Sequence, residues 1–532
     1  MKKTLSLKKV LALILAIVMI VSLVACGGNK NADNDTGNNE PSQGETNNGA
    51  DTEVKYKERV VIANASLLAK LDPQSNNTSV NQHIYELTHN TLVGCDYSTG
   101  ELVPELATSW ELDGLTYTFH LRDDVTFYEG QKFTAEDVKF TYERAATTSS
   151  QKPKVKDIES IEVVDDYTLK ITLANPNAEF LDLMCSPNMS ILCSQTVGEF
   201  NSDAATTDES AKNGTGAYYL TEWVPGDYAL VTRNDNYWGE LPVTKEIKYV
   251  KYGEASARVI ALQTGEVDIC LDVPAIEVPH IEEADNCELL KIPSTKLVYI
   301  GLNVNGVNKA LTDPKVRLAL NYATNTEDII LAQTEGNANP AHGCIPQTQW
   351  GYSDTVKTPS YDIEKAKSLL ADAGYANGLD ITLYYDGSVY PGLYEILQAQ
   401  WAAIGVNLIL GTDDKTILDD HTSTGTHEAT VAQASFSVLD GGLRNLWYSG
   451  SGSNRTMMAD PVLDAMLDDA VKEMDAAKRL PMYEAISQYL TDTGAQIPLY
   501  VDTLLYGVNS NADGYVFYAC GRHDFKNVAV IE

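Results

Sequence analysis

The chain has 532 residues, of which 44% are hydrophobic and 21% are charged, so it can bury more than one globular core. Its formal net charge is -35, from 74 acidic and 39 basic residues. Because binding to phosphate backbones needs clustered Lys and Arg, this balance excludes nucleic acid as the partner. The acidity itself indicates a solvated surface.

The first 26 residues predict an export signal with a lipid attachment point. A basic start, residues 1–9, leads into an apolar run that ends at Val24-Ala25-Cys26. This run is shorter than the roughly 20 residues that a membrane span needs, which favours a signal peptide over residues 1–25. The tetrad from Leu23 to Cys26 resembles the bacterial lipobox, in which the cysteine is lipidated. The resemblance implies an extracytoplasmic protein that is lipid-anchored to the cell membrane through Cys26.

A polar segment follows the signal. Residues 27–51 are dominated by Gly, Asn, Asp, Thr and Glu and show no apolar periodicity. Such a composition has little to bury, so we expect a flexible tether over residues 26–57.

From residue 58 onward the sequence alternates strand and helix signals, which predicts an α/β protein. Residues 60–63 predict the first strand. Alternating apolar residues on both sides of Asp113-Gly114, and again around Asp165-Asp166, predict two hairpins. Thr134, with Asp137 three residues later, predicts a capped helix start.

Three later helices have clear starts. Asp313 and Asp460 are each followed by Pro, which suits a helix N-cap and the first helical position. Asp362 predicts a third start, with a stop at Gly374. After the second of these starts an apolar stripe at helical spacing predicts core packing. The stripe consists of Leu463, Met466, Leu467, Ala470, Val471 and Met474.

The cysteines leave the disulfide pattern open. Seven remain beyond Cys26, and export would allow Cys185 to pair with Cys193, or Cys270 with Cys287. An odd number and the absence of a C-x-x-C motif favour several buried thiols instead.

The search for catalytic motifs finds no G-x-S-x-G, H-E-x-x-H or P-loop sequence. The nearest approach to a metal cluster is a group of ligand types without a recognised spacing, which we interpret as a polar loop before a strand. The group consists of Asp419, Asp420, His421, His427 and Glu428. We therefore expect no metal, no cofactor and no enzymatic activity. An extracellular hydrolase on the same fold stays open as an alternative.

A long series of ordered blocks carries a family resemblance. Its first members are residues 102–111 (LVPELATSWE), 117–122 (YTFHLR) and 134–138 (TAEDV). Further blocks are residues 213–218, 233–239, 261–269, 313–323, 365–375 and 497–500. Together they resemble the family 5 extracellular solute-binding proteins, which serve oligopeptide and dipeptide transport. Within the first blocks, Trp110, Phe119, Phe127 and Val138 have strand or helix spacing and predict core positions.

The resemblance implies an α/β fold of the periplasmic-binding-protein type (type II, cluster C), a clamp of two lobes around a hinged cleft with an extra inserted domain. Domain I would comprise residues 58–95, 199–296 and 500–532, domain II residues 96–198, and domain III residues 297–499. The monomeric clamp would close on a peptide or a related small polar solute and dock on the permease subunits of an ABC transporter. A ligand sensor on the same clamp stays open.

Site residues are carried over from the family by position. Asn77 and Ser79 follow the first strand, and Tyr299 and Asn303 lie at the start of domain III. In the segment 431–440, the Trp and the Asp that peptide-binding members use fall near Ala434 and Ser437. The usual carboxylate partner of a peptide amino terminus is therefore replaced, and a buried ammonium without one would cost several kcal/mol.

Other charges near this segment offer a substitute. Either Asp440 takes over the role of the missing carboxylate, or the ligand has no free amino terminus to pair. Arg444 could hold a ligand carboxylate in a fork. Our hypothesis is that one of these two makes the main charged contact. The remaining predicted ligand residues are Phe436, Ser437, Trp447 and, from another loop, Tyr385.

Overall fold

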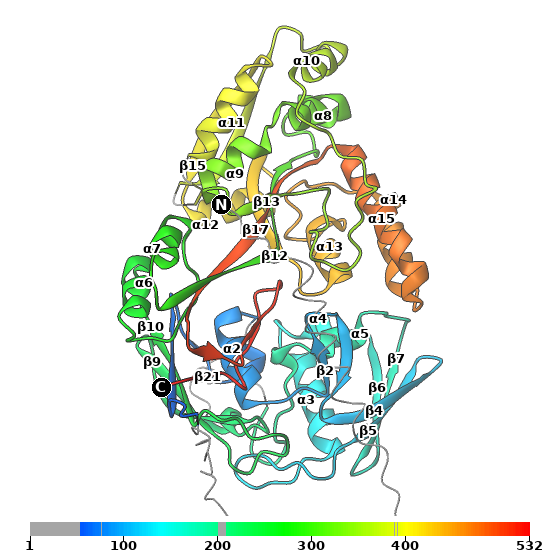
Figure 1. Ribbon diagram of the computed structural model, residues 1–532. Helices are drawn as coiled ribbons and strands as arrows, with labels where there is room; N and C mark the ends of the chain where they lie inside the picture. The colour runs from blue at the N-terminus through cyan, green and yellow to red at the C-terminus, as the bar shows by residue number, and fades with distance from the viewer. Residues whose placement is uncertain (1–53, 76, 200–208, 388, 391) are drawn as a thin grey trace, which may run out of the picture. The chain divides into compact units, whose positions relative to one another are not determined.

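Two long strands, β12 (Cys287–Leu302) and β17 (Gln496–Asn509), pair antiparallel in the middle of the main sheet of this computed structural model. The structure describes residues 54–75, 77–199, 209–387, 389–390 and 392–532. The predicted signal peptide, Cys26 and the first part of the predicted tether lie outside them. Figure 1 shows β12 and β17 passing between the two groups of elements that the sheet joins.

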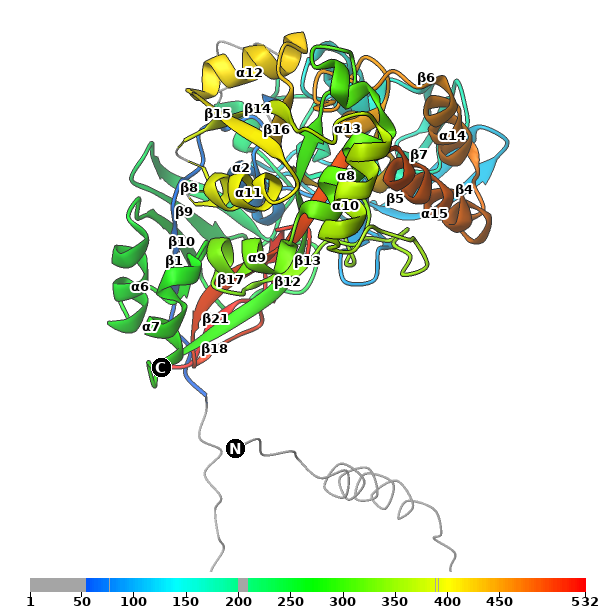
Figure 2. The same ribbon diagram turned by 90° about the horizontal axis from the view of Figure 1, so that it is seen from above.

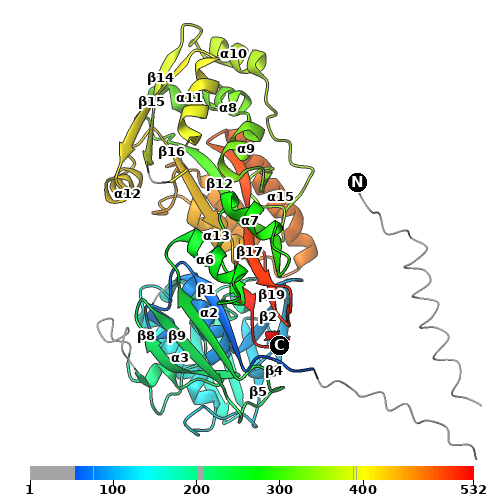
Figure 3. The ribbon, with the colours of Figure 1, turned by 60° about the vertical axis from the view of Figure 1, so that its left-hand side comes forward.

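The main sheet is mixed and has 11 strands, in the order β15-β14-β16-β12-β17-β11-β1-β10-β9-β8, with β13 also paired to β17. On the β17 side lie β1 (Arg59–Asn64), β8 (Tyr218–Val224), β9 (Tyr228–Arg233), β10 (Glu246–Lys251) and β11 (Ile269–Cys270). On the β12 side lie β14 (Leu379–Asp386), β15 (Val406–Asp413) and β16 (Ala429–Ser435), and β13 spans Ala338–Pro340. β1 runs parallel to β10 and β11, and β14 runs parallel to β15 and β16. Figure 3 shows the two sets of strands with β12 and β17 between them.

We call residues 54–286 and 510–532 the first lobe and residues 303–495 the second lobe. Only β12 and β17 run through both sets of pairings in the sheet. Their ladder is irregular between Pro293 and Leu297. At this point the Lys296 ammonium lies 2.9 Å from the Asp502 carboxylate, and the Ser294 hydroxyl donates to the Asp502 carbonyl oxygen at 2.7 Å.

A second, antiparallel sheet of four strands lies in the first lobe, in the order β4-β5-β7-β6. Its strands are β4 (Ala107–Asp113), β5 (Thr116–Leu121), β6 (Ile158–Asp165) and β7 (Thr168–Leu173). β4 and β5 form the hairpin predicted around Asp113-Gly114, where Gly114 has a φ of 62°, which glycine adopts readily. β6 and β7 form the second predicted hairpin. Both predictions are confirmed.

The helices of the first lobe are α2 (Ser79–Thr88), α3 (Ala135–Thr147), α4 (Lys152–Val155), α5 (Phe180–Met184), α6 (Ala255–Gln263) and α7 (Val278–Glu282). Those of the second lobe are α8 (Pro314–Ala323), α9 (Thr326–Thr334), α10 (Ile363–Asp372), α11 (Leu393–Ala402), α12 (Lys415–Thr424), α13 (Leu439–Trp447), α14 (Pro461–Lys472) and α15 (Ala476–Thr493). Figure 2 shows α6 beside α7 and α14 beside α15, and both pairs are in contact. The short strand pairs are β2 (Val93–Asp96) with β3 (Glu101–Pro104), β18 (Ala512–Asp513) with β21 (Ala529–Val530), and β19 (Val516–Phe517) with β20 (His523–Asp524).

The predicted helix starts are confirmed, because each capping side chain accepts a backbone N–H in the first turn. Asp313 accepts from Lys315 N, and Asp362 accepts from Lys365 N. Asp460 caps α14 in the same way, and α3 has the predicted capping box.

The apolar stripe on α14 is confirmed only in part. Leu463, Leu467 and Ala470 are fully buried. Met474 lies beyond the end of the helix at Lys472 and is 41% exposed, so its predicted core position is wrong. The spacing of the apolar residues does not indicate where the helix ends.

The buried apolar residues form separate cores along the chain. One core takes its fully packed members from residues 92–193 and includes Phe119, Phe127 and Val138, with Trp110 partly buried against it. Two others lie within residues 297–501. The remaining cores combine residues 60–87 with residues 217–287 and 505–530. The predicted core positions of the family blocks are therefore confirmed.

The two ends of the described chain meet. Lys57 N donates to Val530 O at 2.8 Å, and Glu532 N donates to Lys55 O at 2.9 Å. The last residues of the predicted tether are thus part of the folded first lobe. Between residues 54 and 532, among those described, no helix combines the length and the apolar character needed to cross a membrane.

A buried ion pair joins the loop after β1 to α3. The Arg144 guanidinium lies 2.5 Å from Asp72 Oδ2, and both side chains are at least 97% buried. Removing one partner leaves the other charge uncompensated, which costs about 3–5 kcal/mol. We predict that Asp72→Ala lowers the free energy of unfolding by this amount in urea denaturation. The double variant Asp72→Ala/Arg144→Met should lose less than Asp72→Ala alone, and an equal or larger loss would contradict the prediction.

Candidate functional site

A cavity of about 150 Å³ lies at the carboxyl end of β16, between β16, β12 and α13. Its walls are mostly small or polar side chains with one aromatic ring from each of two elements. The lining residues are Tyr299, Ala432, Gln433, Ala434, Ser435, Phe436, Gly442, Asn445, Leu446, Ser453 and Arg455. Two predicted ligand residues, Tyr299 and Phe436, therefore come together in one cavity.

Strand register and small residues create this space. Tyr299 of β12 lies opposite Ala432 of β16, whose methyl group leaves room for the ring. Phe436 follows β16 directly and lies against Gly442 of α13, where a Cβ atom would come within 2.5 Å of the ring. A larger residue at either position would fill the cavity.

Arg455 is the one charged residue that lines the cavity. It lies over Gly301 of β12, where a Cβ atom would come within 2.8 Å of the Arg455 Cβ. Its Nη1 donates to Gly452 O at 2.9 Å. Among the residues that the structure describes, no carboxylate lies within ion-pair distance of Arg455. Its guanidinium can therefore receive an anionic group in a fork. The sequence analysis missed Arg455, because no pattern connects it to Phe436.

The two charges predicted for the ligand are paired with each other. Arg444 Nε lies 2.5 Å from Asp440 Oδ2, and Arg444 Nη1 lies 2.8 Å from Asp468 Oδ1. Their spacing of four residues on α13 brings the first pair together on one helix face. Trp447, on the next turn, is buried, with its ring 6.3 Å from that of Tyr299. Ser437 is exposed in the turn before α13.

A carboxylate from the first lobe occupies the start of α13. Glu179, in the segment between β7 and α5, accepts the N–H of Asp440 at 2.5 Å and that of Gly441 at 3.0 Å. It thus satisfies two of the N–H groups that a helix start leaves unpaired. Burial, and next the charge of Asp440, raise the pKa of Glu179 to about 8. No sequence pattern predicts this contact, since Glu179 and Asp440 are 261 residues apart.

On the first-lobe side, Asn77 and Ser79 are both exposed near the start of α2. Asn77 Oδ1 accepts from the Lys154 ammonium at 3.0 Å, and Lys154 also donates to Gln151 Oε1 and Ser186 Oγ. Burial is the main cause that lowers the pKa of Lys154 to about 7. All three acceptors are neutral, and no described carboxylate pairs with this ammonium. Lys154 is a second cation that sequence reasoning missed.

Two predicted residues are placed elsewhere. Asn303 is fully buried, and its Nδ2 donates to the carbonyl oxygens of Gly425 and His427. Tyr385 lies on β14 and stacks on Tyr394 with ring centroids 3.6 Å apart. Neither residue lines the cavity beside β16.

The group of acidic and histidine side chains at residues 419–428 is divided between α12 and the loop before β16. Asp419, Asp420 and His421 lie on α12, so the predicted loop is wrong for these three residues. His427 is buried and bonded to backbone oxygens of His421 and Arg455, and Glu428 accepts from Thr382 N. No cluster of three or more metal-ligating side chains occurs in the described part of the chain.

The described cysteines are all free thiols. Neither Cys185 with Cys193 nor Cys270 with Cys287 forms a disulfide. These four side chains are buried, as expected of small apolar residues.

Comparison with known proteins identifies the family. Residues 101–455 match the family model of the bacterial extracellular solute-binding proteins, family 5. The chain belongs to this family. It is 29% identical over 475 residues to the glutathione-binding protein GsiB of Escherichia coli O1:K1 / APEC, covering 86% of this chain and 91% of that protein. It is 28% identical over 479 residues to the dipeptide-binding protein of Escherichia coli (strain K12), covering 83% and 89% of the two chains.

Solved structures support the same conclusion. The ABC transporter-associated periplasmic binding protein DppA from Helicobacter pylori, in complex with the peptide STSA, is 28% identical to this chain with a TM-score of 0.75. The match covers 89% of this chain and 98% of that chain. The predicted α/β fold of the periplasmic-binding-protein type is therefore confirmed. Family membership also confirms the prediction of a solute-binding protein in place of an enzyme.

The contact between Glu179 and α13 predicts a pH dependence of stability. The raised pKa of Glu179 means that the folded chain holds its proton more tightly than the unfolded chain does. Below about pH 4.5, Glu179 is neutral in the folded and the unfolded chain and does not change the free energy of unfolding. As the pH rises from there to about 8, the buried charge lowers the free energy of unfolding. Asp440, Asp182, Arg444 and Lys156 are the neighbouring charges that modulate this change.

We predict that Glu179→Gln removes this dependence. The melting temperature of the wild type should fall relative to that of the variant between about pH 5 and pH 8, and the difference should then level off. Thermal unfolding of both proteins in a series of buffers measures it. Glu111→Gln, at an exposed position on β4, is the matched control and should track the wild type. A constant difference between wild type and Glu179→Gln would refute the assigned protonation.

Proposed function

We propose that this protein binds a small peptide or peptide-like solute that carries a carboxylate, and that it delivers the solute to the permease subunits of an ABC transporter. The relatives support the chemical class. The names of two relatives state that they bind glutathione and dipeptides, and a third was solved with the peptide STSA. Each of these ligands carries at least one carboxylate and at least one amide bond.

The single observation that carries the proposal is the uncompensated guanidinium of Arg455 in the cavity beside β16. A guanidinium and a carboxylate form two parallel hydrogen bonds, which adds direction as well as energy. Gln433, Ser435 and Asn445 add neutral polar groups to the same walls, and Phe436 adds an apolar face. This set suits a carboxylate attached to a peptide backbone.

The position of the solute's amino group is less directly indicated. Asp440, the predicted substitute carboxylate, has Arg444 as its counter-ion and is 2% exposed. The hypothesis that Asp440 or Arg444 makes the main charged contact stays a prediction. Arg455 lacks a counter-ion in the described structure and lines the cavity, so we propose it as a further candidate for this contact.

Motion and location complete the proposal. The three predicted domains would move as two lobes about the irregular segment of the β12–β17 ladder, which bears Lys296 and Asp502. The monomer would remain outside the cell, anchored by a lipid on Cys26. The family supports an extracellular location, and the lipobox resemblance supports the anchor.

Binding to Arg455 predicts a clear mutational result. We predict that Arg455→Gln weakens binding of glutathione and of a panel of dipeptides about tenfold or more, since a lost charged hydrogen bond costs about 1.5–3 kcal/mol. Arg455→Lys should retain an intermediate affinity. Isothermal titration calorimetry measures these constants, and dipeptide amides should distinguish loss of the carboxylate contact from general damage. Unchanged affinity in Arg455→Gln would exclude this role.

The lipid anchor predicts a separate result in cells. The wild type expressed in a bacterial host should incorporate a labelled fatty acid and fractionate with membranes, because two or more acyl chains hold a protein there stably. Cys26→Ser should lose the label and leave the membrane fraction. Cys95→Ser, which changes a cysteine inside the folded first lobe, is the control and should keep both properties. Labelling of Cys26→Ser would disprove the attachment point.

A further inference from the structure

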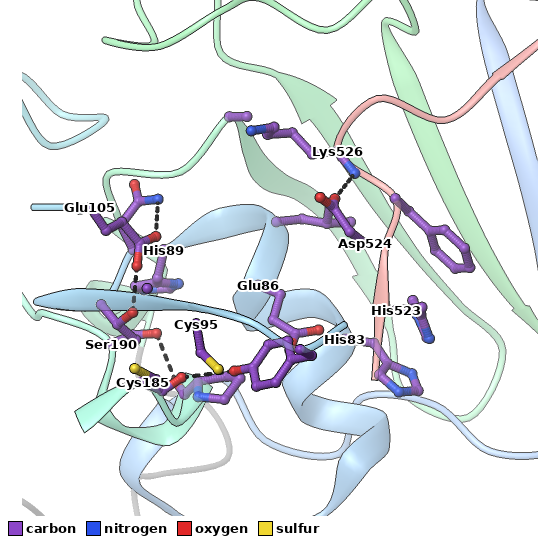
Figure 4. Close-up of a pocket in the computed structure, with 18 of the residues that line it drawn as sticks. His83, Glu86, His89, Cys95, Glu105, Cys185, Ser190, His523, Asp524 and Lys526 are labelled. Carbon is purple, nitrogen blue, oxygen red and sulfur yellow. Dashed lines mark hydrogen bonds between the residues drawn. The ribbon is translucent and has the colours of Figure 1, made fainter. Parts of the chain in front are cut away.

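A second cavity, of about 320 Å³, lies inside the first lobe (Figure 4). Its walls come from α2, from the β2–β3 pair, from residues 185–190, from β10 and from the C-terminal residues 518–526. None of these segments contributes to the cavity beside β16. The two cavities are therefore built by different lobes.

Several buried polar atoms meet in this cavity without a hydrogen-bond partner. They are both ring nitrogens of His83, both ring nitrogens of His523, Oε2 of Glu86 and the hydroxyl oxygen of Tyr249. The backbone of Gly521 faces the His83 ring, although not at hydrogen-bond geometry. Buried polar groups in folded proteins are almost always paired with protein, water or ligand. These atoms need polar partners, which water or a ligand in the cavity would supply.

The two histidines form one end of the cavity. Their ring centroids are 3.7 Å apart, and the two side chains lie next to each other in Figure 4. Burial lowers the pKa of His83 to about 3, and burial, followed by the neighbouring His83, lowers the pKa of His523 well below its usual value. Each neutral imidazole offers one acceptor nitrogen and one N–H donor. Both histidines are more than 90% buried, so bulk water does not form hydrogen bonds with their ring nitrogens.

Carboxylates outnumber cations on the walls. Glu86, Glu105 and Asp524 line the cavity, whereas Lys526 is the one Lys or Arg in the lining. Both oxygens of Glu105 are already bonded, one by Asn90 and the other by Thr91. Glu86 has Arg522 as a partner for Oε1 only, at 3.4 Å. Its second oxygen is therefore the strongest unsatisfied acceptor in the cavity.

Arg522 is a weak counter-ion for Glu86 because it is shared. Its Nη1 also donates to the hydroxyl of Tyr97 at 2.5 Å, and its guanidinium lies over the Tyr97 ring at 4.7 Å. The Tyr97 hydroxyl in turn donates to Cys185 O at 3.1 Å. A positive charge inside the cavity would complement Glu86 without competing with these contacts.

Aromatic faces surround the same space, as a cation requires. Tyr97, Tyr237, Trp238, Tyr249, Tyr518 and Phe525 all line the cavity. The ring faces carry negative potential and stabilise an organic cation when water is excluded. A metal ion is a poorer match, because the described side chains form no cluster of three or more metal ligands here.

We propose that this cavity binds a small organic ammonium ion, held by the unpaired oxygen of Glu86 and by the His83–His523 pair. The ammonium N–H groups donate to Glu86 and to an imidazole nitrogen, and the aromatic walls contact the carbon chain. The volume suits a molecule the size of an amino acid or a short diamine. The site is separate from the solute site with Arg455, so its occupant is a co-ligand or an effector and not the transported solute.

The test compares two probes of equal length. 1,4-Diaminobutane carries two ammonium groups, and 1,4-butanediol replaces them with neutral hydroxyls. We expect the diamine to raise the melting temperature of the wild type and to give a measurable binding isotherm, whereas the diol does neither. Glu86→Gln keeps the shape of the side chain and removes its charge, and it should weaken diamine binding at least tenfold. Tyr249→Phe, which removes a single hydroxyl, should weaken it two- to tenfold and guards against misfolding of the Glu86 variant.

The two sites should respond independently. Glu86→Gln should bind glutathione and dipeptides as the wild type does, and Arg455→Gln should bind the diamine as the wild type does. A crystal grown with the diamine should show it beside Glu86. Equal effects of diamine and diol, unchanged diamine affinity in both Glu86→Gln and Tyr249→Phe, or ordered water alone in the cavity of that crystal would each overturn the proposal.

Discussion

The pairing of β12 with β17 is the constraint on which the rest of the structure depends. In the main sheet, the strands of the first lobe are connected to those of the second lobe only through this ladder, because β11 pairs with β17 and β16 pairs with β12. The ladder has register shifts between Pro293 and Leu297 and between Val298 and Tyr299, and the Lys296–Asp502 ion pair and the Ser294 hydroxyl bond join the two strands at the first of them. In the proposed motion of the lobes, bending would concentrate in this segment, because the regular ladder on either side resists it. The cavity beside β16 is carried on one side of it and Asn77 with Lys154 on the other.

In this acidic protein, some charged side chains pair with one another and stabilise the fold, whereas charged side chains without a counter-ion are the candidates for ligand binding. Asp440, Arg444 and Asp468 neutralise one another on and beside α13, and Glu179 binds the start of the same helix. These contacts fix α13, which supplies Gly442 and Asn445 to the cavity wall. Arg455 and Lys154 have only neutral oxygens as partners. A guanidinium without a counter-ion at a cavity suits a ligand that supplies the missing charge, and Arg455 meets this description.

The cavity in the first lobe is also lined by an unpaired group, but this group is a hydrogen-bond acceptor instead of a cation. There the uncompensated group is an oxygen of Glu86, and the neighbouring imidazoles add acceptors without adding charge. The two cavities thus differ in the charge of the partner that would satisfy them. We proposed the first cavity as the site of the transported solute with support from the family, whereas the proposal for the second rests on burial and unpaired atoms alone.

Local chemistry explains what the sequence by itself determined. Turn residues at Asp113-Gly114, caps at Asp313 and Asp460, and alternation on β4 to β7 act within a few residues, so hairpins and helix starts were predictable. Tyr299 and Phe436, which were both in the predicted ligand set, also line one cavity. The end of α14 was not predictable, because no glycine or proline marks it.

Only the tertiary structure decided which charges are used up and which remain. Asp440 and Arg444 looked available in the sequence, yet they pair with each other. Glu179 reaches α13 across 261 residues, and Lys154 reaches Asn77 across 77. Sequence patterns report spacing along one element, whereas such contacts depend on how separate elements pack. The sequence therefore determined the family and many of the elements and predicts an export signal, whereas the packing of distant segments determined the charge of each cavity.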